Sequence, residues 1–238
     1  MFAWGKSALI AGALVSGSVL ASASALAAPP VYNWTGFYLG ANAGMSGANF
    51  KDTWSDATGV YSVDYGHGAG FSGGGQAGFN VQMPGSNLVA GIEADFQGST
   101  LNAAYADYGP DLHFGTNVNW WGTVRGRVGA AMGNFLPYIT GGLAYGSLTN
   151  YYYDPLTYSP TVIDAKWSTS RMGWTVGGGL QAAITHNISV SAEYLYTDLG
   201  SWSSDTAALD AVSANPPVIA AVEARFSTLR FGIDWKLN

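Results

Sequence analysis

Residues 70–99 read GFSGGGQAGFNVQMPGSNLVAGIEADFQGS, and apolar and polar residues alternate along this stretch. From Phe71 to Met83 every second residue is apolar or small, while the residues between them are polar or glycine. After the sequence PGSN at 84–87 the alternation resumes from Leu88 to Gln97. Because successive side chains of a strand point to opposite faces, this period of two predicts two β-strands joined by a tight turn.

The same alternation recurs along the rest of the chain and predicts eight antiparallel strands in all. The other runs cover 34–45, 118–131, 135–147, 171–184, 188–198 and the end of the chain. Three connections are short turns, whereas the four at 46–69, 101–117, 148–169 and 200–223 are long and polar. This alternation of short and long connections is typical of outer-membrane barrels, which have short periplasmic turns and long extracellular loops.

The two faces of the predicted strands differ in composition. One face carries glycine and polar residues, as if it lined a narrow interior, and the other is apolar with aromatic residues such as Phe37, Phe96, Tyr138 and Trp174 near the strand ends. Beyond the N-terminal region no apolar run reaches the length of about 18 residues that a spanning helix needs. We therefore expect an all-β fold, an eight-stranded antiparallel transmembrane β-barrel with an apolar outer surface, a polar lumen, short periplasmic turns and four long extracellular loops.

The N-terminal region has the features of a secretory signal. Lys6 supplies a positive charge, an apolar stretch of small residues follows, and Ala25–Ala27 matches the A-x-A cleavage pattern. An uncleaved anchor helix is the alternative, but the stretch is only weakly hydrophobic. We predict a signal peptide at 1–27 and a barrel domain at 28–238, with export through the inner membrane and localisation in the outer membrane of a Gram-negative bacterium.

The composition excludes several classes of protein. The 238 residues contain no cysteine, only 10% are charged, and the net charge is -6. Nucleic-acid binding requires a basic surface, which such a chain does not supply. Gly73, Gly75 and Gly78 match a dinucleotide-binding pattern, but that motif must open a helix, and these glycines lie inside an alternating strand.

Charged residues on the predicted lumen face form the main candidate site. Acidic and basic residues nearly balance, and because unpaired charges in a confined interior are costly, we expect them to pair. Eight strands leave an interior that side chains can fill, so a structural plug is favoured over a selective ion pathway or catalytic carboxylates. The predicted lumen charges are Glu93, Asp95, Arg125, Arg127, Arg171, Glu193, Arg230, Asp234 and Lys236.

Two histidines are candidate ligands for haem. His67 and His113 fall in or beside the first two predicted loops, with several tyrosines nearby, and both residue types serve as axial haem ligands. No recognisable haem motif accompanies them, so no cofactor is predicted. A lipid-modifying enzyme would need a catalytic pair at the outer rim; His67 with Ser62 or Asp64 is the weak candidate, and we predict that the protein is not an enzyme.

The strand sequences also resemble a known family. The resemblance rests on WTGFYLGANAG (34–44), GGGQAGFNVQ (73–82), GIEADFQGS (91–99), YITGGLAYG (138–146), AEYLYTDLG (192–200) and LRFGIDWKLN (229–238). These motifs are similar to those of the small porin-like outer-membrane β-barrels of alphaproteobacteria, within the opacity-type barrel superfamily. The resemblance implies an abundant, antigenic outer-membrane barrel, and one branch of the family is associated with haem. Leu237 and Asn238 end the chain where the family usually has an aromatic residue that is thought to be read by the assembly machinery.

From these observations we expect a structural or surface-exposed barrel with a packed, polar and non-conducting lumen. The alternatives are a narrow porin-like channel and a surface protein that binds haem or a host ligand through its loops. The expected partners are outer-membrane lipid and lipopolysaccharide, and the barrel assembly machinery, with no nucleic acid. The sequence does not indicate an oligomeric state.

Overall fold

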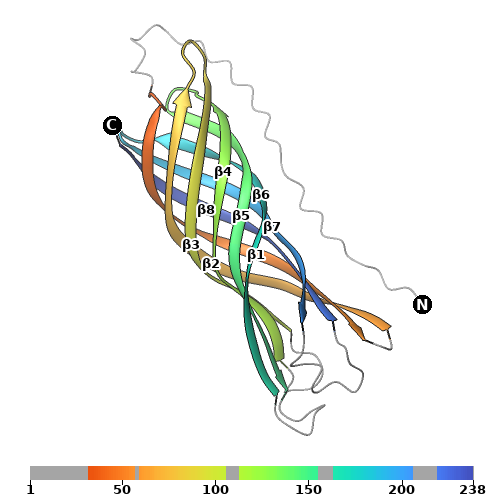
Figure 1. Ribbon diagram of the computed structural model, residues 1–238. Helices are drawn as coiled ribbons and strands as arrows, with labels where there is room; N and C mark the ends of the chain where they lie inside the picture. The colour runs from red at the N-terminus through yellow and green to blue at the C-terminus, as the bar shows by residue number, and fades with distance from the viewer. Residues whose placement is uncertain (1–31, 57–58, 106–112, 155–162, 206–218, 238) are drawn as a thin grey trace, which may run out of the picture. The chain divides into compact units, whose positions relative to one another are not determined.

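The described part of the chain forms a closed antiparallel barrel (Figure 1). The computed structural model describes residues 32–56, 59–105, 113–154, 163–205 and 219–237, so the predicted signal peptide lies outside the described residues. Within these ranges no helix is long and apolar enough to span a membrane. Each strand pairs with its neighbours in sequence, and the last strand pairs with the first. The strands are β1 (Gly36–Asp56), β2 (Gly59–Gln82), β3 (Leu88–Tyr105), β4 (His113–Ala130), β5 (Phe135–Asp154), β6 (Ile163–Ala183), β7 (Ile188–Asp205) and β8 (Ile219–Leu237). The prediction of an eight-stranded barrel is therefore confirmed.

The apolar face of the strands points outward, as the alternation predicted. Leu180 and Gln181 are consecutive in β6, yet the first is 46% exposed and the second 2%. Phe37 packs on Phe79 with ring centroids 4.4 Å apart, and Phe96 packs on Trp120 at 5.4 Å. A surface of exposed large apolar side chains with aromatic pairs near its limits is the lipid-facing band of a membrane barrel.

The strands are longer than predicted, because they continue into the segments expected to be loops. They span 18 to 24 residues, and β1 pairs with β2 as far as Asp56 and Gly59. The period of two fades there because neither face has to meet lipid, but the backbone ladder continues. Large parts of the expected four long loops are thus strand, and their remaining residues lie outside the described ranges.

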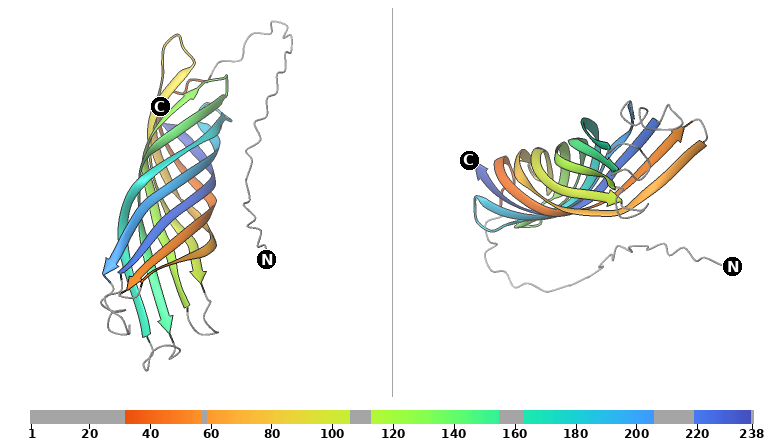
Figure 2. Two further views of the ribbon diagram at one scale, coloured as in Figure 1. Left: turned by 90° about the vertical axis from the view of Figure 1, so that its right-hand side faces the viewer. Right: turned by 90° about the horizontal axis from the view of Figure 1, so that it is seen from below.

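Beyond the apolar band the barrel divides into two sheets. The β6–β7 ladder ends at Trp174 and Asp198, and the β2–β3 ladder ends at Ala69 and Asn102. The pairing of β7 with β8 shifts just after Asp198, where Gly200 has a positive φ of 78°. Such a bulge bends a strand and increases its twist. The outer ends of β1 and β2 consequently separate from those of β4, β5 and β6 (Figure 1 and Figure 2).

Candidate functional site: the barrel lumen

Glycines on the lumen face leave room for large polar neighbours. A Cβ atom at Gly78 would overlap the Tyr38 ring, and one at Gly40 would overlap the Asp234 carboxylate. Small and large residues therefore interdigitate across the narrow interior, as small barrels require. This explains the glycine-rich polar face of residues 70–83 as a packing feature of the lumen.

Six charged side chains meet in the middle of the lumen and form what we call the charge cluster: Glu93, Asp95, Arg125, Arg127, Glu193 and Arg230. Arg125 contacts all three acids, with Nη1 2.8 Å from Glu193 Oε1, Nη2 3.1 Å from Asp95 Oδ2, and Nη2 also paired with Glu93 Oε1. Its side chain is fully buried. Three arginines and three carboxylates balance, so the charge cluster is neutral when all are ionised.

Arg230 completes the charge cluster from the opposite wall of the barrel. Its Nη1 lies 3.0 Å from Asp95 Oδ2 and its Nη2 lies 3.1 Å from Glu93 Oε1. Nη2 also lies 2.6 Å from Glu193 Oε2. Arg230 belongs to β8, whereas Glu93 and Asp95 belong to β3, which is not a neighbour of β8 in the barrel, so these ion pairs cross the lumen.

Two tyrosines support Arg127 in the charge cluster. Arg127 Nη1 donates a hydrogen bond of 3.0 Å to Tyr38 Oη, which in turn donates one of 2.7 Å to Glu93 Oε2. The guanidinium carbon of Arg127 lies 3.9 Å from the centre of the Tyr138 ring. The prediction that Tyr138 faces lipid is wrong: it is 8% exposed, on the same face of β5 as the buried Thr140. Because Tyr138 and Thr140 are two residues apart, the alternation in the sequence already places them on the same face.

Three of the predicted lumen charges lie outside the charge cluster. Asp234 is buried, but it accepts hydrogen bonds from Gln76 Nε2 at 2.5 Å and Gln181 Nε2 at 2.9 Å rather than from a base. Lys236 lies near the end of the lumen that the three short turns surround, which we call the short-turn mouth. Its Nζ donates a hydrogen bond to the backbone oxygen of Asn33 at 2.7 Å. Arg171 lies on the lumen face of β6 toward the outer end, opposite Gly146 of β5.

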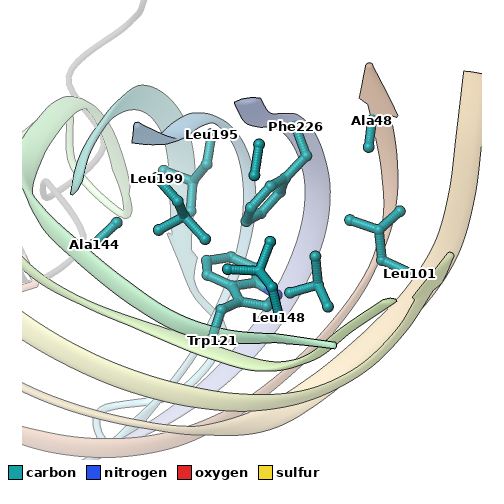
Figure 3. Close-up of a cluster of buried hydrophobic side chains, with 10 residues drawn as sticks. Ala48, Leu101, Trp121, Ala144, Leu148, Leu195, Leu199 and Phe226 are labelled. Carbon is teal, nitrogen blue, oxygen red and sulfur yellow. The ribbon is translucent and has the colours of Figure 1, made fainter. Parts of the chain in front are cut away.

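An apolar layer fills the lumen on the outer side of the charge cluster, a feature that the prediction of a packed, polar lumen does not include. Trp121 and Phe226 pack edge to face with ring centroids 5.3 Å apart, and both side chains are buried (Figure 3). We call this layer the outer apolar cluster, and its members are Ala48, Leu101, Val118, Trp121, Ala144, Leu148, Leu195, Leu199, Ala224 and Phe226.

Bulges explain why the sequence pattern misplaced part of this layer. Val118 shares its parity with the lipid-facing Val124 and was predicted to point outward, yet it is fully buried. The β4 ladder shifts between Val118 and Trp120 against β5, and β3 shifts between Gly98 and Leu101 against β4. The inserted residue in β4 reverses the face of the residues beyond it, so Val118 turns into the lumen, whereas Leu101, Leu148 and Phe226 keep the lumen parity of their own strands.

A second apolar layer closes the lumen at the short-turn end. We call it the inner apolar cluster, and it consists of Trp34, Val89, Ala131, Leu136 and Ala183, with Tyr32 packed against it. Leu136 is fully buried, and Trp34 is 3% exposed. The charge cluster therefore lies between two apolar layers.

The candidate haem ligands do not form a described site. The backbone of His67 lies in β2 opposite Asn49, and that of His113 begins β4 opposite Tyr153, so both belong to strands rather than loops. Their side chains lie outside the described residues. Among the residues that are described, no group of three or more His, Asp or Glu side chains could hold a metal ion.

Comparison with known proteins identifies the family. A family model described as the outer membrane protein beta-barrel domain matches residues 13–235. The chain belongs to the outer-membrane β-barrel family. The family assignment agrees with the closed barrel and its apolar outer surface, and it places the protein in the outer membrane.

Relatives support the assignment along most of the chain. The 31 kDa outer-membrane immunogenic protein of Brucella melitensis biotype 1 is 34% identical over 237 residues, which cover 94% of this chain and 93% of that protein. The 22 kDa outer membrane protein of Rhizobium leguminosarum bv. viciae is 35% identical over 171 residues, 71% of this chain and 66% of that protein. These relatives agree with the predicted resemblance to outer-membrane barrels of alphaproteobacteria.

Among solved structures, the outer membrane protease OmpT from Escherichia coli is similar with a TM-score of 0.50. The similarity covers 85% of this chain and 97% of OmpT, at 10% sequence identity. An identity this low shows the shared barrel fold alone, because function depends on particular site residues rather than on the fold.

Proposed function

We propose that this outer-membrane barrel is a structural and surface-displayed protein whose lumen does not conduct ions or solutes. The observation that carries the proposal is the filled lumen, in which the charge cluster lies between the outer and inner apolar clusters. A solute crossing the barrel would have to displace two apolar layers and separate buried ion pairs. Breaking buried pairs exposes uncompensated charge and costs several kcal/mol.

The same packing argues against an enzyme. A catalytic carboxylate must reach a substrate, whereas Glu93, Asp95 and Glu193 are each at least 94% buried and are engaged with arginines. Their positions lie beneath apolar layers at both ends of the lumen. They stabilise the interior of the barrel, and they are not presented to a substrate.

Surface display follows from the length of the strands. The strands continue beyond the lipid-facing band on the side of the long connections, which in outer-membrane barrels is the extracellular side. The Brucella relative is described as an outer-membrane immunogenic protein. We infer a surface-exposed, antigenic role for this chain. We also propose insertion by the barrel assembly machinery after removal of residues 1–27, and a surrounding of outer-membrane lipid and lipopolysaccharide.

Cysteine labelling on intact cells tests whether the barrel is exposed at the cell surface and which of its ends faces outward. The chain contains no cysteine, so a single introduced thiol gives an unambiguous signal. Ser168 is exposed on the outer segment of β6, and Ser86 is exposed in the turn between β2 and β3. We expect a membrane-impermeant maleimide to label Ser168→Cys on intact cells, and to label Ser86→Cys only after the outer membrane is permeabilised. The reverse pattern, or no labelling of Ser168→Cys on intact cells, would contradict the proposal.

A further inference from the structure

The four residues before β1 lie outside the sheet, and one of them, Trp34, buries its side chain in the lumen. Tyr32, Asn33, Trp34 and Thr35 have no strand structure, and the ladders of β1 with β2 and β8 begin at Gly36 and Phe37. Despite this, the Trp34 side chain is only 3% exposed. A buried indole on a segment with no ladder pairing means that side-chain packing holds the segment in place.

The indole closes the short-turn mouth of the lumen. Trp34 packs into the inner apolar cluster with Val89, Leu136 and Ala183, which come from three different strands. The Tyr32 ring covers Trp34 from outside, edge to face, with ring centroids 4.6 Å apart. The inner apolar cluster therefore depends on a side chain that is delivered by the segment and not by the barrel wall.

Two polar residues of the barrel wall clamp the segment. Gln82, the last residue of β2, accepts a hydrogen bond of 3.2 Å from Trp34 N through Oε1 and donates one of 2.9 Å from its own N to Thr35 Oγ1. Lys236 donates from Nζ to Asn33 O at 2.7 Å and lies 4.7 Å from the centre of the Tyr32 ring. All of these contacts involve side chains, so they can break while the backbone ladder of the barrel stays intact.

A glycine connects the segment to the barrel. Gly36 has a φ of 143°, a conformation that residues with a Cβ rarely adopt. It stands between the last residue of the segment and the first lipid-facing residue of β1. This position allows the chain to turn sharply from the lumen mouth into the wall, and it is the natural pivot for any movement of the segment.

We propose that Tyr32–Thr35 is a hinged stopper of the short-turn mouth, and that its release admits water and small solutes into the lumen as far as the charge cluster. This inference rests on the closed lumen proposed above and adds a local opening to it. Release exposes the inner apolar cluster and opens a path to the charge cluster. It leaves the charge cluster and the outer apolar cluster in place, because both are built entirely from the barrel wall.

Thiol reactivity in the inner apolar cluster tests the stopper. Ala183→Cys places a reporter that is nearly the size of the original residue against Trp34, in the folded full-length mature barrel in detergent. The probe is the water-soluble reagent 2-sulfonatoethyl methanethiosulfonate. Adding Trp34→Ala should raise the labelling rate of this reporter by at least about tenfold, because the rate follows the population of the locally open state. Lys236→Met, which removes the clamp but keeps the side-chain stem, should raise it by a smaller factor.

Two controls separate release of the stopper from a general loosening. Trp235→Ala removes an exposed tryptophan from the lipid face of β8 at the same end of the barrel and should leave the labelling of Ala183→Cys unchanged. A reporter at Ala144→Cys, in the outer apolar cluster, should stay unlabelled in the Trp34→Ala background. The stopper is contradicted if Trp34→Ala and Lys236→Met leave the rate unchanged, or if Trp235→Ala or the Ala144→Cys reporter responds equally.

The labelling and conductance results separate the stopper from the proposed function. Channel currents from the unmutated barrel would overturn the closed lumen but would leave a labelling contrast between the Trp34 and Trp235 variants intact. Unchanged labelling together with an absence of currents would overturn the stopper alone.

Discussion

Arg125→Ala is expected to lower the free energy of unfolding by about 3–5 kcal/mol, the usual cost of removing one partner from a buried ion cluster. Arg125 contacts Glu93, Asp95 and Glu193, as Arg230 does, and its side chain is fully buried. Its removal leaves these carboxylates short of positive charge where water cannot replace it. Reversible unfolding in urea, with the barrel in lipid vesicles, measures the loss.

Arg225→Ala is the matched control for that substitution. Arg225 also pairs with two acids, Asp198 at 3.0 Å and Glu223 at 3.3 Å, but its side chain is 49% exposed. Exposed ion pairs contribute about 0–1 kcal/mol, because water and salt screen them. Equal losses for Arg125→Ala and Arg225→Ala would contradict the description of the charge cluster as a buried structural element.

Ile92→Arg is expected to destabilise the barrel by about 2–4 kcal/mol, the cost of arginine on the lipid face near the bilayer midplane. Ile92 is 66% exposed and lies on β3 midway between the turn at Leu88 and the aromatic pair of Phe96 and Trp120. The next residue, Glu93, is buried in the lumen, so the substitution tests the assignment of the two faces at one point of the strand.

Ser170→Arg is the comparison for Ile92→Arg, at a position farther from the bilayer midplane. Ser170 is exposed on the outer face of β6, beyond Trp174 in the direction of the long connections. Arginine near or beyond the membrane interface costs about 0–1 kcal/mol. The same unfolding experiment should therefore rank Ile92→Arg well above Ser170→Arg, and the opposite ranking would mean that the lipid-facing band has been misplaced.

Most of the barrel wall could be predicted from the period of two. The hairpin at 70–99 fixed two strands and their faces, and the same parity placed Glu93, Arg125 and Arg230 together in the lumen before any distance was known. Antiparallel pairing of neighbouring strands brings same-face residues within reach of an ion pair. The structure places Glu93 directly opposite Arg125 in the β3–β4 ladder.

The features that could not be predicted depend on local irregularity. A bulge reverses the face of every residue beyond it, so the alternation could not show that Val118 joins the outer apolar cluster. Beyond the lipid-facing band the strands need no apolar face. The alternation therefore predicts strands that are shorter than the observed ones. The predicted first strand begins at Trp34, whereas in the structure Trp34 precedes the sheet and fills the short-turn mouth.

Single-channel recording of the refolded barrel in a planar bilayer tests the central claim, that the lumen is filled and closed. With Arg125, Glu193 and Arg230 joined across the interior between two apolar layers, we expect no discrete or steady currents from the unmutated protein at either polarity. Protein-free bilayers define the background. Reproducible unitary currents from the unmutated barrel would contradict the closed lumen and would favour a narrow channel.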